Sequence, residues 1–171
     1  IIKDEADKDY QLMSGISENI ETTDNIWISS RARLPWLLVA LFGGIIGSRV
    51  ISIYEPQIQI NPEMAFFMPL IAAMGGNVGV QSSALVVQGL ANNTLGRDGI
   101  LPKLLKEFWL GMVNGLICSG ILLMYNLLFN NSMALSITVS TALMSVIAFA
   151  AIFGTAVPLV LDRFKIDPAL A

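Results

Sequence analysis

Four long apolar stretches constrain this chain more than any other feature of its sequence. They run from about Pro35 to Tyr54, Glu63 to Leu90, Leu104 to Phe129 and Met133 to Leu161. A helix needs about 20 residues to cross a hydrocarbon core of about 30 Å, and each stretch is long enough. The stretches are too continuous for strands of an outer-membrane barrel, which alternate over roughly 10 residues. The sequence therefore predicts an all-α, polytopic membrane protein with a bundle of four transmembrane helices.

The composition supports a membrane protein. Hydrophobic residues make up 54% of the chain and charged residues only 13%, against about 25% charged in soluble domains. No basic patch indicates a nucleic-acid partner. Histidine is absent, which removes the commonest general base and transition-metal ligand. The single cysteine, Cys118, cannot form an internal disulfide. Because the chain begins with Ile1 and not with methionine, we interpret it as a fragment of a longer protein.

Charge is distributed unevenly along the chain. Seven of its 13 acidic residues lie within the first 24 positions, and we expect an acidic amphipathic cytoplasmic helix ahead of the spans. This gives two parts, a connecting segment 1–29 and a transmembrane domain 30–171. Lysine or arginine residues precede the first span, lie in or near the loop between spans two and three, and follow span four, whereas segments 55–62 and 130–132 have none. Arg49, near the outer end of the first span, is the exception. Positive residues favour the cytoplasmic side, so both termini are expected there, in an inner membrane.

Small residues recur at four-residue intervals in two spans. Gly43 and Gly47 form such a pair in the first span, and Gly111, Gly115 and Ser119 form a ladder in the third. Small side chains let membrane helices approach closely. We therefore expect these positions to face neighbouring helices.

The second span contains the stretch GGNVGVQSS at residues 75–83, which is unusually polar for a buried helix. Asn77 and Gln81 are four residues apart and so share one helix face, and Ser82 is expected near that face. Pro69 upstream favours a kink. Two interpretations remain open. The stretch is either a helix interface joined by hydrogen bonds, or the wall of a pore in which neutral oxygens contact a hydrated cation such as Mg²⁺.

Three motifs resemble those of the MgtE family of magnesium channels and transporters. The first is Pro69 followed by GGNVGVQS at 75–82. The second is SRARLPWL at 30–37, which is similar to that family's entry to its first span. The third is DPAL at 167–170, which resembles the entry to its last span. The spacing of the three motifs matches over nearly the whole chain.

The resemblance implies a homodimer in the lipid bilayer with an ion path for Mg²⁺ at the dimer interface. The second and fifth transmembrane helices of the family line that path. The positions of this chain that match the lining motif are Gly75, Gly76, Asn77, Gly79, Val80, Gln81 and Ser82.

The resemblance also implies gating by cytosolic Mg²⁺. Asp167 matches an aspartate at the cytoplasmic mouth that holds regulatory Mg²⁺. Glu5 and Asp9 match acids of a plug helix, although Lys8 stands where the family has an acid. Family members also carry CBS domains and a fifth helix, which begins near where this chain stops. We therefore expect the domain 30–171 to be truncated before the fifth helix.

These observations predict a magnesium channel and not an enzyme. An intramembrane enzyme is disfavoured because the spans contain neither histidine nor paired carboxylates. Two alternatives remain. One is a non-conducting membrane scaffold or assembly subunit, in which residues 75–83 only pack. The other is an ion-coupled divalent cation carrier, which would favour more ionisable groups inside the spans. Two interpretations of Glu107, near the start of the third span, also remain open: an ion pair with Lys103, four residues away, or an approach to the cytoplasmic mouth of the pore.

Overall fold

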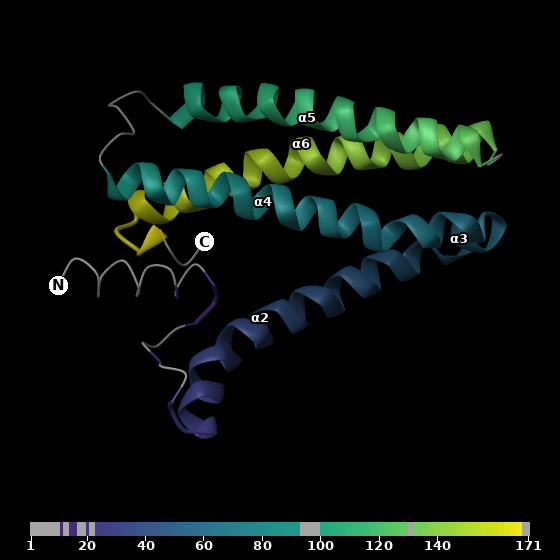
Figure 1. The fold of residues 1–171 in the computed structure, drawn as a ribbon. Coiled ribbons are helices and arrows are strands. Elements are labelled where there is room, and N and C mark those ends of the chain that lie inside the picture. The colour runs from purple at the N-terminus through teal and green to yellow at the C-terminus, as the bar shows by residue number, and fades with distance from the viewer. Residues whose placement is uncertain are drawn as a thin grey trace. The chain divides into compact units, whose positions relative to one another are not determined.

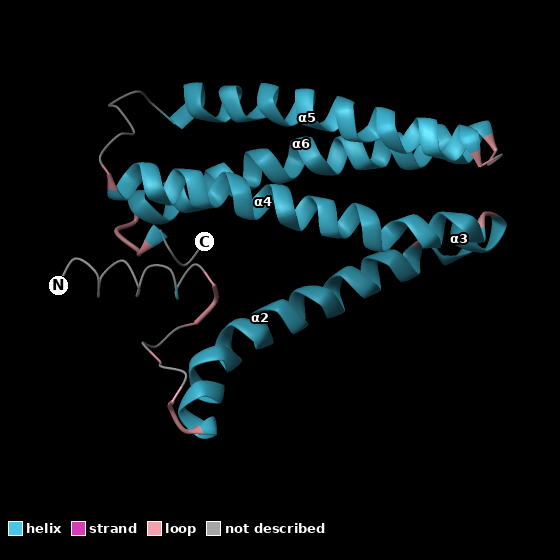
Figure 2. Ribbon diagram, viewed as in Figure 1, coloured by secondary structure: helices cyan, strands magenta, loops and turns pink. Residues whose placement is uncertain are grey.

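The computed structural model describes residues 11, 14–16, 20, 23–92, 100–129 and 132–168, and every regular element among them is a helix. Figure 2 shows this all-helical composition. The chain divides into two units, one ending at Gln57 and one starting at Ile58. Most of the predicted acidic connecting segment 1–29 lies outside the described residues, which include only 11, 14–16, 20 and 23–29 of it.

Four described helices are long and apolar enough to cross a membrane. They are Ile26–Ile53, Pro62–Ala91, Ile100–Leu128 and Met133–Arg163. The predicted all-α class and the four membrane-length helices are confirmed. A long apolar run can satisfy its backbone in lipid as a helix.

The first unit contains helix α2, Ile26–Ile53. Its N-cap is Asn25, whose Oδ1 accepts a hydrogen bond from the Trp27 amide at 3.4 Å. The helix thus begins well before the expected start at Pro35, which lies inside it. Proline favours the first turn of a helix but is tolerated inside membrane helices. Pro35 therefore does not coincide with the start of α2. An added Cβ at Gly43 or Gly47 meets no described atom within 4 Å. Because α2 belongs to the first unit, the expected helix packing of this pair stays a prediction.

A short helix α3 (Glu55–Ile60) and a 3₁₀ helix η1 (Pro62–Phe67) lead into the second long span. The second unit is then built from α4 (Met68–Ala91), α5 (Ile100–Leu128) and α6 (Met133–Arg163). Figure 1 shows α5 and α6 running side by side, with α4 against α6. Ser132 caps α6 through a hydrogen bond accepted by its Oγ from the Leu135 amide, at 3.2 Å.

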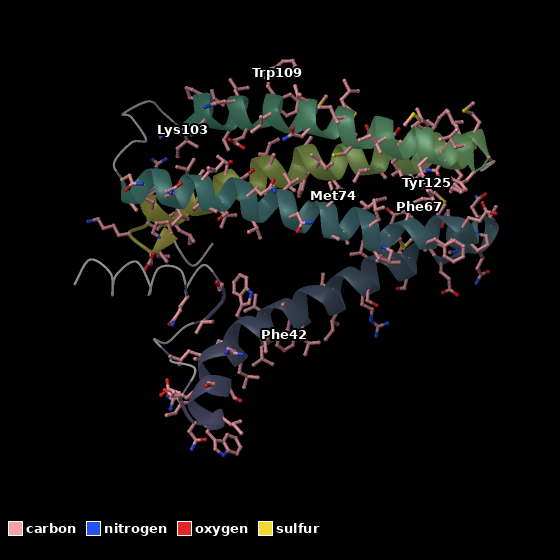
Figure 3. All side chains as sticks on the ribbon, viewed as in Figure 1. Phe42, Phe67, Met74, Lys103, Trp109 and Tyr125 are labelled. Atoms are coloured by element: carbon pink, nitrogen blue, oxygen red, sulfur yellow. The ribbon has the colours of Figure 1, made fainter. Side chains whose placement is uncertain are left out.

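Helix α6 forms the centre of the second unit, because it packs against both α4 and α5. It supplies Val139, Leu143 and Ile147 to the main apolar cluster, and Ile147 is completely buried. Phe67 of η1 and Met74 of α4 pack on that cluster from the other side. In Figure 3, Phe67 and Tyr125 lie near one end of this unit, and Lys103 and Trp109 lie nearer the other.

The predicted small-residue ladder of the third span is confirmed in α5. Gly111, Gly115 and Ser119 are buried. A Cβ added at Gly111 would lie 3.0 Å from Ala151 Cβ, and one at Gly115 would lie 3.3 Å from the Met144 carbonyl oxygen. Glycine therefore lets the backbones of α5 and α6 approach closely.

Candidate functional site

The polar stretch of residues 75–83 lies within α4, which is one continuous helix from Met68 to Ala91. Pro69 lies in the first turn of that helix and not within its middle. The first-turn amides have no partner inside the helix, so a proline there costs no hydrogen bond. The prediction of a kink at Pro69 is therefore wrong. Pro69 lies at the start of α4, directly after the 3₁₀ helix η1.

One face of α4 is left open by the packing on α6. Gly76, Asn77, Val80 and Gln81 are all exposed, and Val80 is 68% exposed. Their spacing repeats with the helical turn, so they form a continuous strip. We call these four residues the amide face. Uncompensated amide side chains are costly in hydrocarbon. Covering protein or water is needed against this face in a membrane.

The opposite side of the same stretch packs on α6. A Cβ added at Gly154 of α6 would lie 2.5 Å from the Gly79 carbonyl oxygen and 3.0 Å from Gly79 Cα. A Cβ added at Gly79 itself meets no described atom within 4 Å. One added at Gly75 would lie 2.7 Å from a methyl carbon of Val146. Gly75 and Gly79 are only partly exposed, so both contribute to helix packing.

Ser82 is buried and lies away from the amide face. Its Oγ donates a hydrogen bond to Glu107 Oε2 of α5, at 3.2 Å. Successive helix residues differ by about 100° in direction, so Ser82 is turned well away from Gln81. The sequence grouped Ser82 with Asn77 and Gln81 and did not indicate its hydrogen bond to Glu107. The expected pairing of Glu107 with Lys103 stays a prediction. An acid within an apolar span was the signal that Glu107 needed a polar neighbour.

Among the described residues, no group of three or more His, Cys, Asp or Glu side chains could hold a metal ion. Asp167 is exposed just beyond the end of α6. Glu5 and Asp9 lie outside the described residues. Mg²⁺ is often held through its waters by one or two carboxylates, so Asp167 offers suitable donor chemistry for part of a site. Further ligands would have to come from elsewhere in the protein.

The helices and the amide face together define a multi-pass membrane protein with a polar face on a membrane-length helix. A family model described as "MgtE: Divalent cation transporter" matches residues 68–171. The chain belongs to the MgtE family of divalent cation transporters. The resemblance seen in the sequence motifs is thereby confirmed.

Three relatives that match 85–100% of the chain are each named magnesium transporter MgtE. The magnesium transporter MgtE of Bacillus subtilis is 30% identical over 167 residues, which is 98% of this chain and 37% of that protein. The magnesium transporter MgtE of Enterococcus faecalis is 29% identical over 171 residues, which is 100% of this chain and 38% of that protein. The Thermus thermophilus protein of the same name is 30% identical over 145 residues, covering 85% and 31% of the two chains. The chain therefore spans 31–38% of the length of these relatives.

Proposed function

We propose that the protein containing this chain transports Mg²⁺ passively through a channel-like pore at a homodimer interface. The observation that carries the proposal is the exposed amide face of α4, with Asn77 and Gln81 one turn apart on a membrane-length helix. A second copy of the chain placed against this face would keep the amides away from lipid. The names of the relatives supply the ion.

The chemistry of the amide face suits a hydrated divalent cation. Mg²⁺ gives up its water reluctantly, and amide oxygens can accept hydrogen bonds from that water. Neutral groups bind such an ion weakly enough for it to leave again, as conduction requires. Gly76, next to Asn77, leaves space beside the amides because it has no side chain. In this proposal Gly75 and Gly79 shape the path through their packing, and Ser82 acts from behind it through Glu107.

Cytosolic Mg²⁺ is proposed to gate the pore. Asp167 would bind a regulatory ion together with acids of the connecting segment 1–29, including Glu5 and Asp9. Clustered carboxylates repel one another, and a divalent cation relieves that repulsion. The arrangement requires segment 1–29 and Asp167 to lie on the cytoplasmic side of the inner membrane, with residues 30–171 forming the transmembrane domain. The protein is proposed to be a transporter without enzymatic activity.

The test is Mg²⁺ uptake into proteoliposomes containing the full-length protein, comparing wild type with Asn77→Leu and Gln81→Leu. Both substitutions replace an exposed amide by an apolar side chain of similar size. We expect uptake to fall at least tenfold in each variant while the dimer stays intact. Gln57→Leu is the matched control, because it makes the same chemical change outside α4, and it should leave uptake near the wild-type rate.

Normal uptake in both α4 variants would overturn the assignment of the pore to this face. If the variants instead lose their dimer while any remaining dimer conducts normally, the stretch serves only for packing. That result would favour the scaffold interpretation of residues 75–83. Size-exclusion chromatography of each variant, run before reconstitution, separates the two outcomes.

A further inference from the structure

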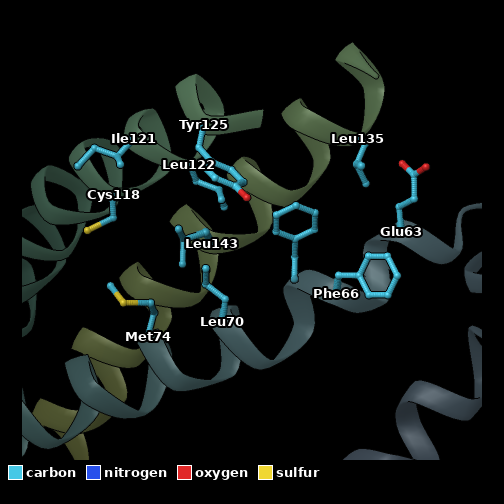
Figure 4. Close-up of a pocket in the computed structure, with 11 residues that line it drawn as sticks. Glu63, Phe66, Leu70, Met74, Cys118, Ile121, Leu122, Tyr125, Leu135 and Leu143 are labelled. Carbon is cyan, nitrogen blue, oxygen red and sulfur yellow. The ribbon is translucent and has the colours of Figure 1, made fainter. Parts of the chain in front are cut away.

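A pocket that α4 helps to form lies outside the amide face. A pocket of about 790 Å³ lies between η1, α4, α5 and α6. Its lining is almost entirely apolar and includes Leu70, Met74, Leu122 and Leu143. Figure 4 shows these side chains around a common space. The volume falls within the range of pockets that hold small molecules.

The pocket is open along its side and not enclosed. Phe66, Ile121 and Tyr125 line it and are 79%, 60% and 49% exposed. The helices that carry its walls are long enough to cross a membrane. The opening thus lies on the side of membrane-length helices, and a molecule that enters it from the bilayer must be soluble in lipid.

The length of the pocket corresponds to most of one bilayer leaflet. On α5 the lining runs from Tyr125 to Cys118, two turns or ~10 Å along the helix. On α6 it runs from Leu135 to Leu143, a rise of ~12 Å. Half of the hydrocarbon core is ~15 Å thick. An acyl chain that enters at the helix ends would reach the floor of the pocket within its own leaflet.

The two most polar side chains of the described lining lie toward one end of the pocket. Glu63 of η1 is the one charged residue among the described residues that line it, and it precedes α4. Tyr125 lies three residues before the end of α5 and has the amphipathic character of residues at the membrane surface. Figure 4 shows Glu63 at the edge of the lining side chains. Within the described lining, a group bound at this rim would meet a carboxylate and no lysine or arginine.

We propose that this pocket binds one phospholipid with a primary-amine headgroup, such as phosphatidylethanolamine. The acyl chain lies along Met74, Cys118 and Leu143, and the ammonium group pairs with the Glu63 carboxylate. The same carboxylate disfavours an anionic headgroup, because like charges repel. The site is separate from the amide face, so this proposal does not depend on the proposed transport of Mg²⁺.

Photo-crosslinking of the full-length protein in phosphatidylcholine nanodiscs tests the proposal without any substitution. Phosphatidylethanolamine, phosphatidylcholine and phosphatidylglycerol are each added in turn with a photoactivatable group midway along one acyl chain. Mass spectrometry then locates the crosslinks. We expect them to gather at Met74 and Cys118. The ethanolamine lipid should give roughly threefold to tenfold more product there than the choline lipid, and the glycerol lipid the least.

Two variants and their matched controls refine the test. Ile121→Trp fills the open side of the pocket and should lower crosslinking at Cys118 severalfold. Leu116→Trp adds the same ring at a 64% exposed position on another side of α5 and should not. Glu63→Gln keeps the shape of the side chain but should abolish the preference for ethanolamine over choline. Glu55→Gln removes an acid that does not line the pocket and should preserve that preference.

Two results with the wild-type protein would overturn the proposal. Crosslinking at Met74 and Cys118 no stronger than at Leu116 would mean that lipid only surrounds the bundle. Crosslinking at Leu116 but none at the pocket would mean that another part of the protein, or a second copy, fills the space. A variant that fails to give a single size-exclusion peak is set aside, and the wild-type map alone then decides.

Discussion

Ser82 of α4 donates a hydrogen bond to Glu107 of α5, with 3.2 Å between Ser82 Oγ and Glu107 Oε2. The two helices otherwise pack mainly on α6, which lies between them. The hydrogen bond is thus a direct polar link from the amide-bearing helix to α5. Ser82 is only 6% exposed, so its hydroxyl depends on this acceptor.

Removal of the acceptor is expected to destabilise the bundle. Glu107→Ala leaves the Ser82 hydroxyl buried without its acceptor, at a cost of about 1–2 kcal/mol. Glu107→Gln keeps an oxygen at the same place and should cost less. The measurement is reversible unfolding in mixed micelles of both variants, with Ser82→Ala and the double variant completing a cycle. A coupling energy of zero would show that the hydrogen bond does not contribute to stability.

The crossing of α4 and α6 provides a second prediction. Gly154→Ala places a methyl group 2.5 Å from the Gly79 carbonyl oxygen, and a backbone atom cannot move aside easily. Overpacking of this kind costs about 1–3 kcal/mol. Gly79→Ala is the matched control, because its Cβ meets no described atom within 4 Å. Thermal unfolding in detergent should show a lower midpoint for Gly154→Ala only. Equal midpoints would contradict the close approach of the two backbones.

Helix α5 also offers two glycines for a matched comparison, one packed against α6 and one with no close neighbour. Gly111→Val adds bulk next to Ala151 Cβ and Ala148 Cα, which an added Cβ would already approach to 3.0 Å and 3.2 Å. Gly120→Val makes the same change on the same helix, where nothing lies within 4 Å of the Cβ position. We expect Gly111→Val to lower the yield of folded protein severalfold and Gly120→Val to change it little. Fluorescence-detected size-exclusion chromatography of tagged variants measures this difference directly.

The proposed gating makes a prediction for Asp167. Asp167→Asn removes a negative charge beyond the end of α6, so a regulatory Mg²⁺ ion would bind there less tightly. The cytosolic Mg²⁺ concentration that halves transport should rise severalfold, whereas the maximal rate at low Mg²⁺ should not change. Patch-clamp recording from spheroplasts at several internal Mg²⁺ concentrations separates the two quantities. An unchanged inhibition curve would exclude Asp167 from the regulatory site.

The number and type of the long elements could be predicted from the sequence because each membrane-length helix contains a long apolar run. Their limits were less predictable. Pro35 suggested a helix start, yet Asn25 caps the helix and Pro35 lies inside it. Proline is compatible with both positions in a membrane helix, so its presence could not decide between them.

The candidate site was predicted only in part, because burial of a helix face depends on which neighbour packs against it. The four-residue spacing of Asn77 and Gln81 correctly placed them on one face. The spacing did not reveal that α6 contacts the side containing Gly79, nor that Ser82 faces Glu107. Those contacts join residues far apart in sequence. The hydrogen bond between Ser82 and Glu107 depends on the relative positions of two separate helices.

The packing at Gly79 and Gly154 has a consequence for how this protein can change over generations. Within residues 75–83, positions on the amide face alternate with positions held against α6 or α5. Neighbouring residues are therefore under different constraints. Residues on the amide face must suit the ion or the protein that contacts that face, whereas residues against α6 or α5 must fit the space between the helix backbones. Tolerance to substitution should therefore rise and fall with each helical turn along residues 75–83.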